Sequence, residues 1–95
     1  MSAAQTLLDS GFDSLLATNG ETLTMNGSTF LGIVDRNYGW KVNRTDLSII
    51  ECKTTALAAE PVNGAQITDA FGNRHRITRS LRTGSWYRVE CVTSR

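Results

Sequence analysis

The sequence predicts a mainly β fold, a small β-barrel or sandwich with a short N-terminal α-helix (α+β). Three observations predict it. The 95 residues fit one domain, residues 20–95 contain short alternating apolar runs separated by turn residues, and residues 1–19 carry apolar side chains at helical spacing. We therefore expect a single domain over residues 1–95, with a helical segment at 1–19 and the barrel or sandwich at 20–95.

The N-terminal segment has both a start signal and a stop signal for a helix. Ser2 and Gln5 have the spacing of a capping box, and Asn19-Gly20 is typical of a helix C-terminus. Between them, one helix face carries Leu7, Leu8, Phe12, Leu15 and Leu16. Two interpretations stay open, a helix packed on the sheet and a partly ordered arm that docks on a neighbouring molecule.

The strongest local signal is a β-hairpin. Two strand-like runs, Glu21–Met25 and Ser28–Asp35, flank Asn26-Gly27, and this dipeptide favours the two positive φ angles of a type I′ turn. The two-residue turn predicts two cross-strand pairs, Leu23 with Phe30 and Thr24 with Thr29.

Four further strands are expected. They are Ser48–Ala58, Ala65–Ala70, Arg74–Leu81 and Ser85–Thr93. In the first of them, alternation places Ile50, Cys52, Thr54 and Ala56 on one face.

The last two strands are expected to form a hairpin around Arg82-Thr83-Gly84. A three-residue turn joins apolar to apolar residues and opposite charges to each other. It predicts the pairs Ile77–Val89, His75–Cys91 and Arg76–Glu90.

The connection Asp35–Leu47 is longer than most connections in compact domains, which favours a functional loop. Aromatic and basic residues within it resemble the anchors of a protein interface. The candidate interface residues are Arg36, Tyr38, Trp40, Lys41 and Arg44. The alternative is that Trp40 folds back and covers the core.

The sequence contains no recognisable catalytic, cofactor or metal motif. The single histidine, His75, has no Cys or carboxylate at ligand spacing and is interpreted as a structural residue. Cys52 and Cys91 lie in apolar runs, and we expect two buried thiols rather than a disulfide. No apolar run approaches the length of a membrane span. We expect no enzyme activity, no cofactor and no membrane association.

The charge is unevenly distributed although the net charge is only +1. Residues 1–60 carry four Lys or Arg against seven Asp or Glu, whereas residues 61–95 carry six Arg against two acidic residues. This distribution suits two surfaces facing different partners, and it is also compatible with an ordinary polar surface.

A group of residues in the last hairpin is a candidate DNA-facing or partner-facing surface. The group comprises Arg74, Arg76, Arg82, Trp86 and Arg88. Arginines beside an aromatic residue on a small barrel also fit an alternative function, an OB-like domain that binds single-stranded nucleic acid. The low net charge and the few aromatic residues weigh against that alternative.

Several segments together resemble the head–tail joining proteins of tailed phages, in particular the lambda-type tail attachment family. They are the helical Leu-Leu…Phe…Leu-Leu start, the Asn-Gly-x-x-x-x-Gly-Ile-x-Asp-Arg segment from Asn26 to Arg36, and the tail from the Phe-Gly-Asn-Arg-His-Arg-Ile-Thr segment to Trp-Tyr-Arg-Val-Glu-Cys-Val. The resemblance extends over essentially the whole chain.

This resemblance implies a structural protein of a phage or prophage virion. Copies would form a ring, a hexamer, between a connector or portal-side protein and a tail-side protein, completing the head and docking the tail. DNA would only pass through the lumen. The protein would act in the host cytoplasm during assembly and remain at the head–tail junction of the virion. The family offers no catalytic residues to carry over.

Overall fold

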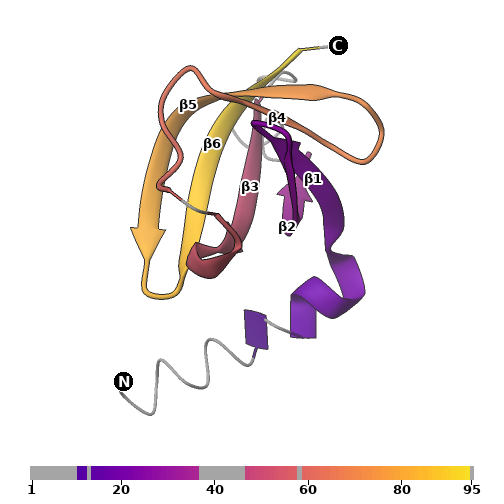
Figure 1. The fold of residues 1–95 in the computed structure, drawn as a ribbon. Coiled ribbons are helices and arrows are strands. Elements are labelled where there is room, and N and C mark those ends of the chain that lie inside the picture. Colours follow the sequence, from indigo (N-terminus) through magenta and orange to yellow (C-terminus); the bar gives the residue numbers. More distant parts are fainter. Residues whose placement is uncertain (1–10, 13, 37–46, 58, 95) are drawn as a thin grey trace.

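Six antiparallel strands among the described residues close into a barrel (Figure 1). The structure is a computed structural model that describes residues 11–12, 14–36, 47–57 and 59–94. The strands are β1 (Glu21–Met25), β2 (Ser28–Asp35), β3 (Leu47–Lys53), β4 (Gln66–Thr68), β5 (Arg74–Thr83) and β6 (Trp86–Ser94). Their order around the barrel is β1-β2-β3-β6-β5-β4, and the pairing of Thr24 with Thr68 joins β4 back to β1. The predicted mainly β fold is confirmed, and of its two forms the barrel is the correct one.

The first hairpin is confirmed residue by residue. Strands β1 and β2 have the predicted bounds, and Asn26 and Gly27 have φ angles of 53° and 79°. These are the positive angles that a type I′ turn requires. Leu23 lies opposite Phe30, and both side chains are buried in the core.

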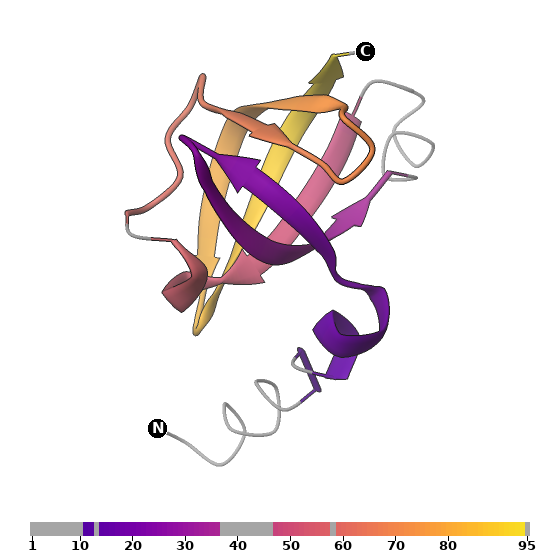
Figure 2. The same cartoon turned by 45° about the vertical axis from the view of Figure 1, so that its right-hand side comes forward.

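A short helix precedes the barrel and packs on its outer surface (Figure 2). Residues 11–12 and 14–19 are helical, and the Gly20 N–H donates to the Leu16 carbonyl at 2.9 Å where the helix ends. Phe12 is buried and stacks on Trp86 of β6, with ring centroids 5.2 Å apart. This contact supports a helix packed on the sheet. The predicted capping box, together with Leu7 and Leu8, lies outside the described residues.

The expected strand Ser48–Ala58 is too long. Strand β3 ends at Lys53, and a 3-10 turn, η1 (Thr54–Ala56), follows it. Lys53 pairs with Trp86, the first residue of β6, so β6 has no further residue with which Thr54 could pair. The Thr54 N–H instead donates to the Ser85 carbonyl at 2.9 Å, and Thr54 and Ala56 are not strand residues. Ile50 and Cys52 do point into the core as predicted.

The predicted register of the last hairpin is wrong by two residues. Thr83 pairs with Trp86, so the turn consists of Gly84 and Ser85, and a β-bulge lies at Thr78. The observed pairs are Ile77–Cys91, His75–Thr93 and Arg76–Val92. A shift of two residues preserves the face of a strand, and His75 and Ile77 therefore still point inward together. The pair preferences used for the prediction contain no signal for a bulge.

The bulge also reverses the alternation of side chains in the second half of β5. After it, Arg79 lies opposite Glu90, whereas Arg82 lies opposite the buried Tyr87. Arg82 therefore does not share the outer face with Arg74 and Arg76, which corrects the prediction for these three arginines.

The core fills the interior of the barrel, and one glycine of β2 makes room for it. The buried cluster consists of Leu23, Phe30, Ile50, Cys52, Ile67, Ile77, Tyr87, Val89 and Cys91. A Cβ atom at Gly32 would lie 2.6 Å from Leu23 Cδ1 and 3.1 Å from the Glu51 carbonyl oxygen. Since Leu23 is itself fully buried, it has no free space into which to move.

We therefore expect Gly32→Ala to lower the free energy of unfolding by about 1–3 kcal/mol, the usual cost of overpacking a core. Urea denaturation followed by Trp fluorescence measures the change. Gly11→Ala is the matched control, because its added Cβ would meet no atom within 4 Å. An unchanged urea midpoint for Gly32→Ala would show that the interior tolerates the methyl group and would contradict this description of the core.

Candidate functional site

A largely buried polar cluster joins residues of β1, β3, β5 and β6 to the segments that follow β2 and β4. We call it the Asp69 cluster, and it consists of Glu21, Arg36, Ser48, Asp69, His75 and Thr93. Asp69 directly follows β4, and His75 lies on the neighbouring β5. Ser48 and His75 occupy inward positions of their strands and are each 1% exposed. Strand alternation places both side chains in the interior, where their polar atoms need partners.

The His75 imidazole is bonded at both ring nitrogens. Nε2 lies 2.8 Å from Asp69 Oδ2, and Nδ1 lies 2.9 Å from Ser48 Oγ and 3.1 Å from Thr93 Oγ1. Thr93 Oγ1 also donates to Ser48 Oγ at 3.2 Å. A consistent set of bonds has Nε2–H donating to Asp69, the Ser48 hydroxyl donating to Nδ1 and the Thr93 hydroxyl donating to Ser48 Oγ, so that Thr93 lies near Nδ1 without a bond to it.

Asp69 has the most partners in the cluster. Its Oδ1 accepts from the backbone N–H groups of Phe71 and Asn73, both at 2.9 Å, and its Oδ2 accepts from Arg36 at 3.1 Å as well as from His75. Burial by itself would raise the pKa of this carboxyl group. The hydrogen bonds from His75, the two N–H groups and Arg36 outweigh burial, so the pKa of Asp69 lies well below its usual value.

Arg36 joins the cluster to strand β1. The same Nη2 atom that contacts Asp69 donates to Glu21 Oε2 at 2.8 Å, and the Ala70 N–H donates to that oxygen at 3.1 Å. The bond to Glu21 is the main reason why the pKa of Arg36 is raised, although burial acts in the opposite direction. Arg36 was predicted as a partner-facing residue, and its side chain is 38% exposed. Its guanidinium nevertheless already bonds within the domain.

The cluster contains the residue types of a serine hydrolase triad, but not its arrangement. In such a triad the histidine Nε2 faces serine and Nδ1 faces the carboxylate. Here Ser48 contacts Nδ1 and Asp69 contacts Nε2, and neither Ser48 nor His75 reaches the surface. A nucleophile needs access to substrate. We therefore interpret the cluster as structural, in agreement with the structural role predicted for His75.

Metal binding finds no support in the residues that the structure describes, because they contain no group of three His, Cys, Asp or Glu side chains able to hold an ion. Cys52 and Cys91 are both buried and free, as expected. Burial raises the pKa of the Cys52 thiol to about 11, and burial with the nearby Glu90 raises that of Cys91 to about 12. Both thiols are therefore poor ligands and poor nucleophiles at neutral pH.

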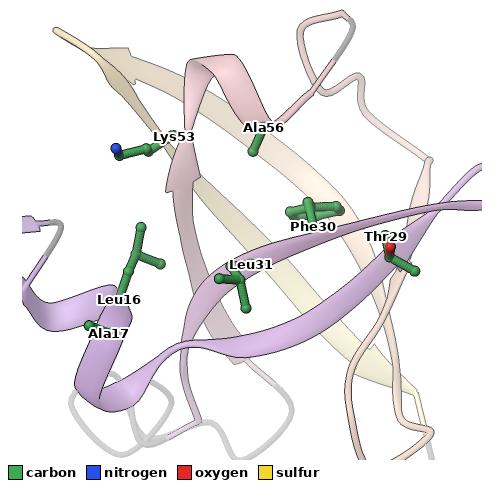
Figure 3. Close-up of a pocket in the computed structure, with 7 residues that line it drawn as sticks. All are labelled: Leu16, Ala17, Thr29, Phe30, Leu31, Lys53 and Ala56. Carbon is green, nitrogen blue, oxygen red and sulfur yellow. The ribbon is translucent and has the colours of Figure 1, made fainter.

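An apolar groove lies between the helix, strand β2 and the segment from the end of β3 into η1 (Figure 3). Its volume is about 490 Å³. The lining residues are Leu16, Ala17, Thr29, Phe30, Leu31, Lys53 and Ala56. Leu31 is 53% exposed, so an apolar side chain of β2 stands open to solvent. We refer to this feature as the groove.

The candidate DNA-facing or partner-facing residues do not form one surface. Arg74, Arg76 and Arg88 are exposed, but Arg82 lies on another face of the sheet. Trp86 is half-buried, and Phe12 covers one face of its indole. That face is not available for stacking on a nucleic-acid base.

The remaining interface candidates, Tyr38, Trp40, Lys41 and Arg44, lie outside the described residues. Strand β2 ends at Asp35 as predicted, and β3 begins at Leu47, one residue before the predicted start at Ser48. Both interpretations of Trp40, as an interface anchor and as a residue that covers the core, stay predictions.

Sequence reasoning missed most of the Asp69 cluster and the whole groove. A signal for Asp69 exists, because an Asp shortly before a Gly-Asn pair is typical of an Asx turn, in which its side chain bonds the backbone two residues on, here at Phe71. No local signal links Ser48 to His75, since their strands meet only through β6, which lies between them and pairs with both. The groove depends on where the helix rests, which the helix sequence does not specify.

Comparison of the chain with protein-family models, with curated protein sequences and with solved structures found no match. Among the described residues, no helix has the length and apolar character needed to cross a membrane.

The Asp69 cluster predicts a specific pH dependence of stability. Because the pKa of Asp69 is lowered by folding, the unfolded chain binds this proton more readily than the folded one. The contribution of Asp69 is therefore complete above its unfolded pKa of about 3.9 and is lost progressively as the pH falls below that value. We expect Asp69→Asn to destabilise the protein by about 3 kcal/mol at pH 7, and by less at pH 3.

Urea denaturation of both proteins at the two pH values measures this difference. Glu60→Gln, which removes an exposed carboxylate at a turn, is the matched control and should unfold like the wild type. A difference between wild type and Asp69→Asn that is equal at pH 7 and pH 3 would rule out the ionised carboxylate as the stabilising group.

Proposed function

We propose that this chain is a structural assembly protein of a phage or prophage particle. Copies form a ring, a hexamer, at the head–tail interface, where they complete the head and dock the tail. The observation that carries the proposal is the groove: an apolar hollow beside the helix of a barrel in which the polar side chains of Asp69, His75 and Arg36 are engaged with one another. The phage assignment itself rests on the sequence resemblance described above.

Exposed side chains are available for the association of such a chain. The strands pair around a closed barrel, in which β1 meets β4 through the single pair Thr24–Thr68. Side-chain surfaces outside this pairing can contact a partner. Leu15, Leu31, Val62 and Phe71 are more than half exposed and offer such surfaces.

The polar residues of the interior support a binding role rather than a chemical one. Hydrogen bonds within the cluster already occupy these polar groups: Ser48 bonds His75, and Asp69 bonds both His75 and Arg36. Surface features then carry the function, with partners on the connector or portal side and on the tail side. The DNA only passes through the lumen of the ring, and the protein acts in the host cytoplasm and in the virion.

The alternative function, binding of single-stranded nucleic acid, has less support. Arg79 and Arg88 lie opposite Glu90 and Glu51, which offset their charge, and the Trp86 indole is partly covered by Phe12. We expect no measurable binding of a fluorescent oligonucleotide at physiological salt in an anisotropy titration. Micromolar binding that is lost in Arg76→Ala would favour the alternative.

The assembly role predicts a defined defect in particle formation. Disrupting the gene in the genome that encodes the chain should leave filled heads and complete tails unjoined, because the layer that docks them is missing. Adding the purified protein to this extract should restore joining, as counted by electron microscopy and by infectious titre. The Glu60→Gln protein is the control and should restore joining equally well. Normal joining without the chain would refute the proposal.

A further inference from the structure

The chain contains three Asn-Gly pairs, Asn19-Gly20, Asn26-Gly27 and Asn63-Gly64. In such a pair the glycine nitrogen can attack the carbonyl carbon of the asparagine side chain, because glycine has no side chain that obstructs the approach. Asparagine is for this reason among the thermolabile residues of proteins. All three asparagines are exposed. Exposure therefore does not distinguish the three pairs, and their backbone contacts have to.

Two of the three glycine nitrogens are held by hydrogen bonds. The Gly20 N–H donates to the Leu16 carbonyl at 2.9 Å, and the Gly64 N–H donates to the Ile77 carbonyl at 2.8 Å. An attacking nitrogen must lose its proton and move toward the side chain. Both changes break the hydrogen bond, so these two pairs are protected by the fold.

The third glycine nitrogen has no such constraint. Gly27 lies in the turn between the paired residues Met25 and Ser28. Its N–H has no acceptor among the residues that the structure describes. The peptide unit between Asn26 and Gly27 therefore rotates without breaking a hydrogen bond.

This rotation brings the two reacting atoms together while the strands stay paired. Ring closure needs the Gly27 nitrogen to eclipse the Cα–Cβ bond of Asn26, which requires a ψ of about −120° at Asn26, the value that a type II′ turn has at this position. The type I′ turn has a ψ of about +30° there. Rotating the one peptide plane converts the first turn into the second. Asn26, with a φ of 53°, keeps its positive φ in both turns, and Gly27 tolerates either sign of φ. Both turns join the same two-residue hairpin.

The same rotation gives no reactive geometry at Asn63. The Ala65 N–H donates to the Val62 carbonyl at 3.2 Å, and Gly64 has a φ of 89°, which together define a type II turn. Rotating its central peptide plane yields a type I turn with a ψ of about −30° at Asn63. It also breaks the bond from Gly64 to Ile77.

We propose that Asn26 is a site of spontaneous deamidation in the folded protein. The Gly27 nitrogen loses its proton and forms a bond to Asn26 Cγ, the Cγ–Nδ2 bond breaks, and Nδ2 leaves as ammonia. Water then opens the cyclic imide. Opening of the new Cγ–N bond gives aspartate, whereas opening of the original peptide bond gives isoaspartate. This inference does not depend on the proposed function.

The two products affect the first hairpin differently. Both add a negative charge at the exposed tip of β1 and β2. Aspartate suits the existing turn, because Asp-Gly favours type I′. Isoaspartate inserts an extra carbon into the backbone of the turn, on whose geometry the pairing of Leu23 with Phe30 depends. The isoaspartate product therefore weakens the hairpin as the protein ages.

Peptide mapping of the aged full-length protein tests the proposal. The protein is incubated at mildly alkaline pH, both folded and in urea, and is then cleaved after glutamate. Glu21 and Glu60 lie between the three asparagines, so Asn19, Asn26 and Asn63 fall in separate peptides. Mass spectrometry follows the conversion of each amide to the acid, and the rate in urea is the reference for each site. We expect folding to slow Asn19 and Asn63 about tenfold more than Asn26, roughly the effect of one hydrogen bond.

Two variants identify the reacting residue independently of the mapping. Asn26→Gly removes the amide and keeps the turn, because Gly-Gly also favours type I′. It should abolish the early acidic species in isoelectric focusing. Asn63→Ser, at another exposed Asn-Gly pair, is the matched control and should retain that species.

Three results would overturn the proposal. The first is conversion of Asn19 or Asn63 in the folded protein as fast as that of Asn26. The second is conversion of Asn26 in urea only, which would show that the turn does not reach the reactive geometry. The third is persistence of the early acidic species in Asn26→Gly.

Discussion

The completely buried carboxylate of Asp69 determines how the short strand β4 is held in this barrel. The Asp69 side chain has no exposed surface, and a buried charge is tolerated only when it is fully compensated. Compensation comes from Arg36 after β2, His75 on β5 and two N–H groups of the following turn. The short strand β4 has three residues and contributes few ladder bonds of its own. The contacts of Asp69 therefore connect this weak part of the barrel to the longer strands.

The same contacts determine what the surface presents. Arg36 is fixed between Asp69 and Glu21, and from there its guanidinium covers one face of Phe71. The turn that carries Phe71 is formed by the carboxylate itself. The buried cluster and the exposed aromatic side chain are thus parts of one arrangement, and a change in the interior alters the surface. The groove shares no lining residue with the Asp69 cluster, and the helix that forms one side of it contacts the barrel through the stacking of Phe12 on Trp86.

Local signals in the sequence were sufficient for much of the fold. The Asn26-Gly27 turn set the register of β1 and β2, since only one pairing satisfies both its φ angles and the apolar positions. Asn19-Gly20 correctly marked the end of the helix.

The errors in the predicted structure arose where residues distant in the sequence determine the strand pairing or the side-chain contacts. The bulge at Thr78 and the end of β3 at Lys53 follow from the way β6 pairs with two strands at once. Ser48 and His75 meet only because β6 lies between their strands and pairs with both. The groove likewise needs a helix and two strands in place.

The central claim is that the Asp69 cluster is a structural network in which His75 donates from Nε2. Because the chain contains one histidine, nitrogen-15 NMR observes this side chain without ambiguity. We expect a proton on Nε2 that exchanges slowly with water, because the ring is buried and bonded to Asp69. We expect Asp69→Asn to shift this signal strongly and to accelerate its exchange. An imidazole protonated at Nδ1 alone, or an Nε2 proton in rapid exchange with water, would contradict the account.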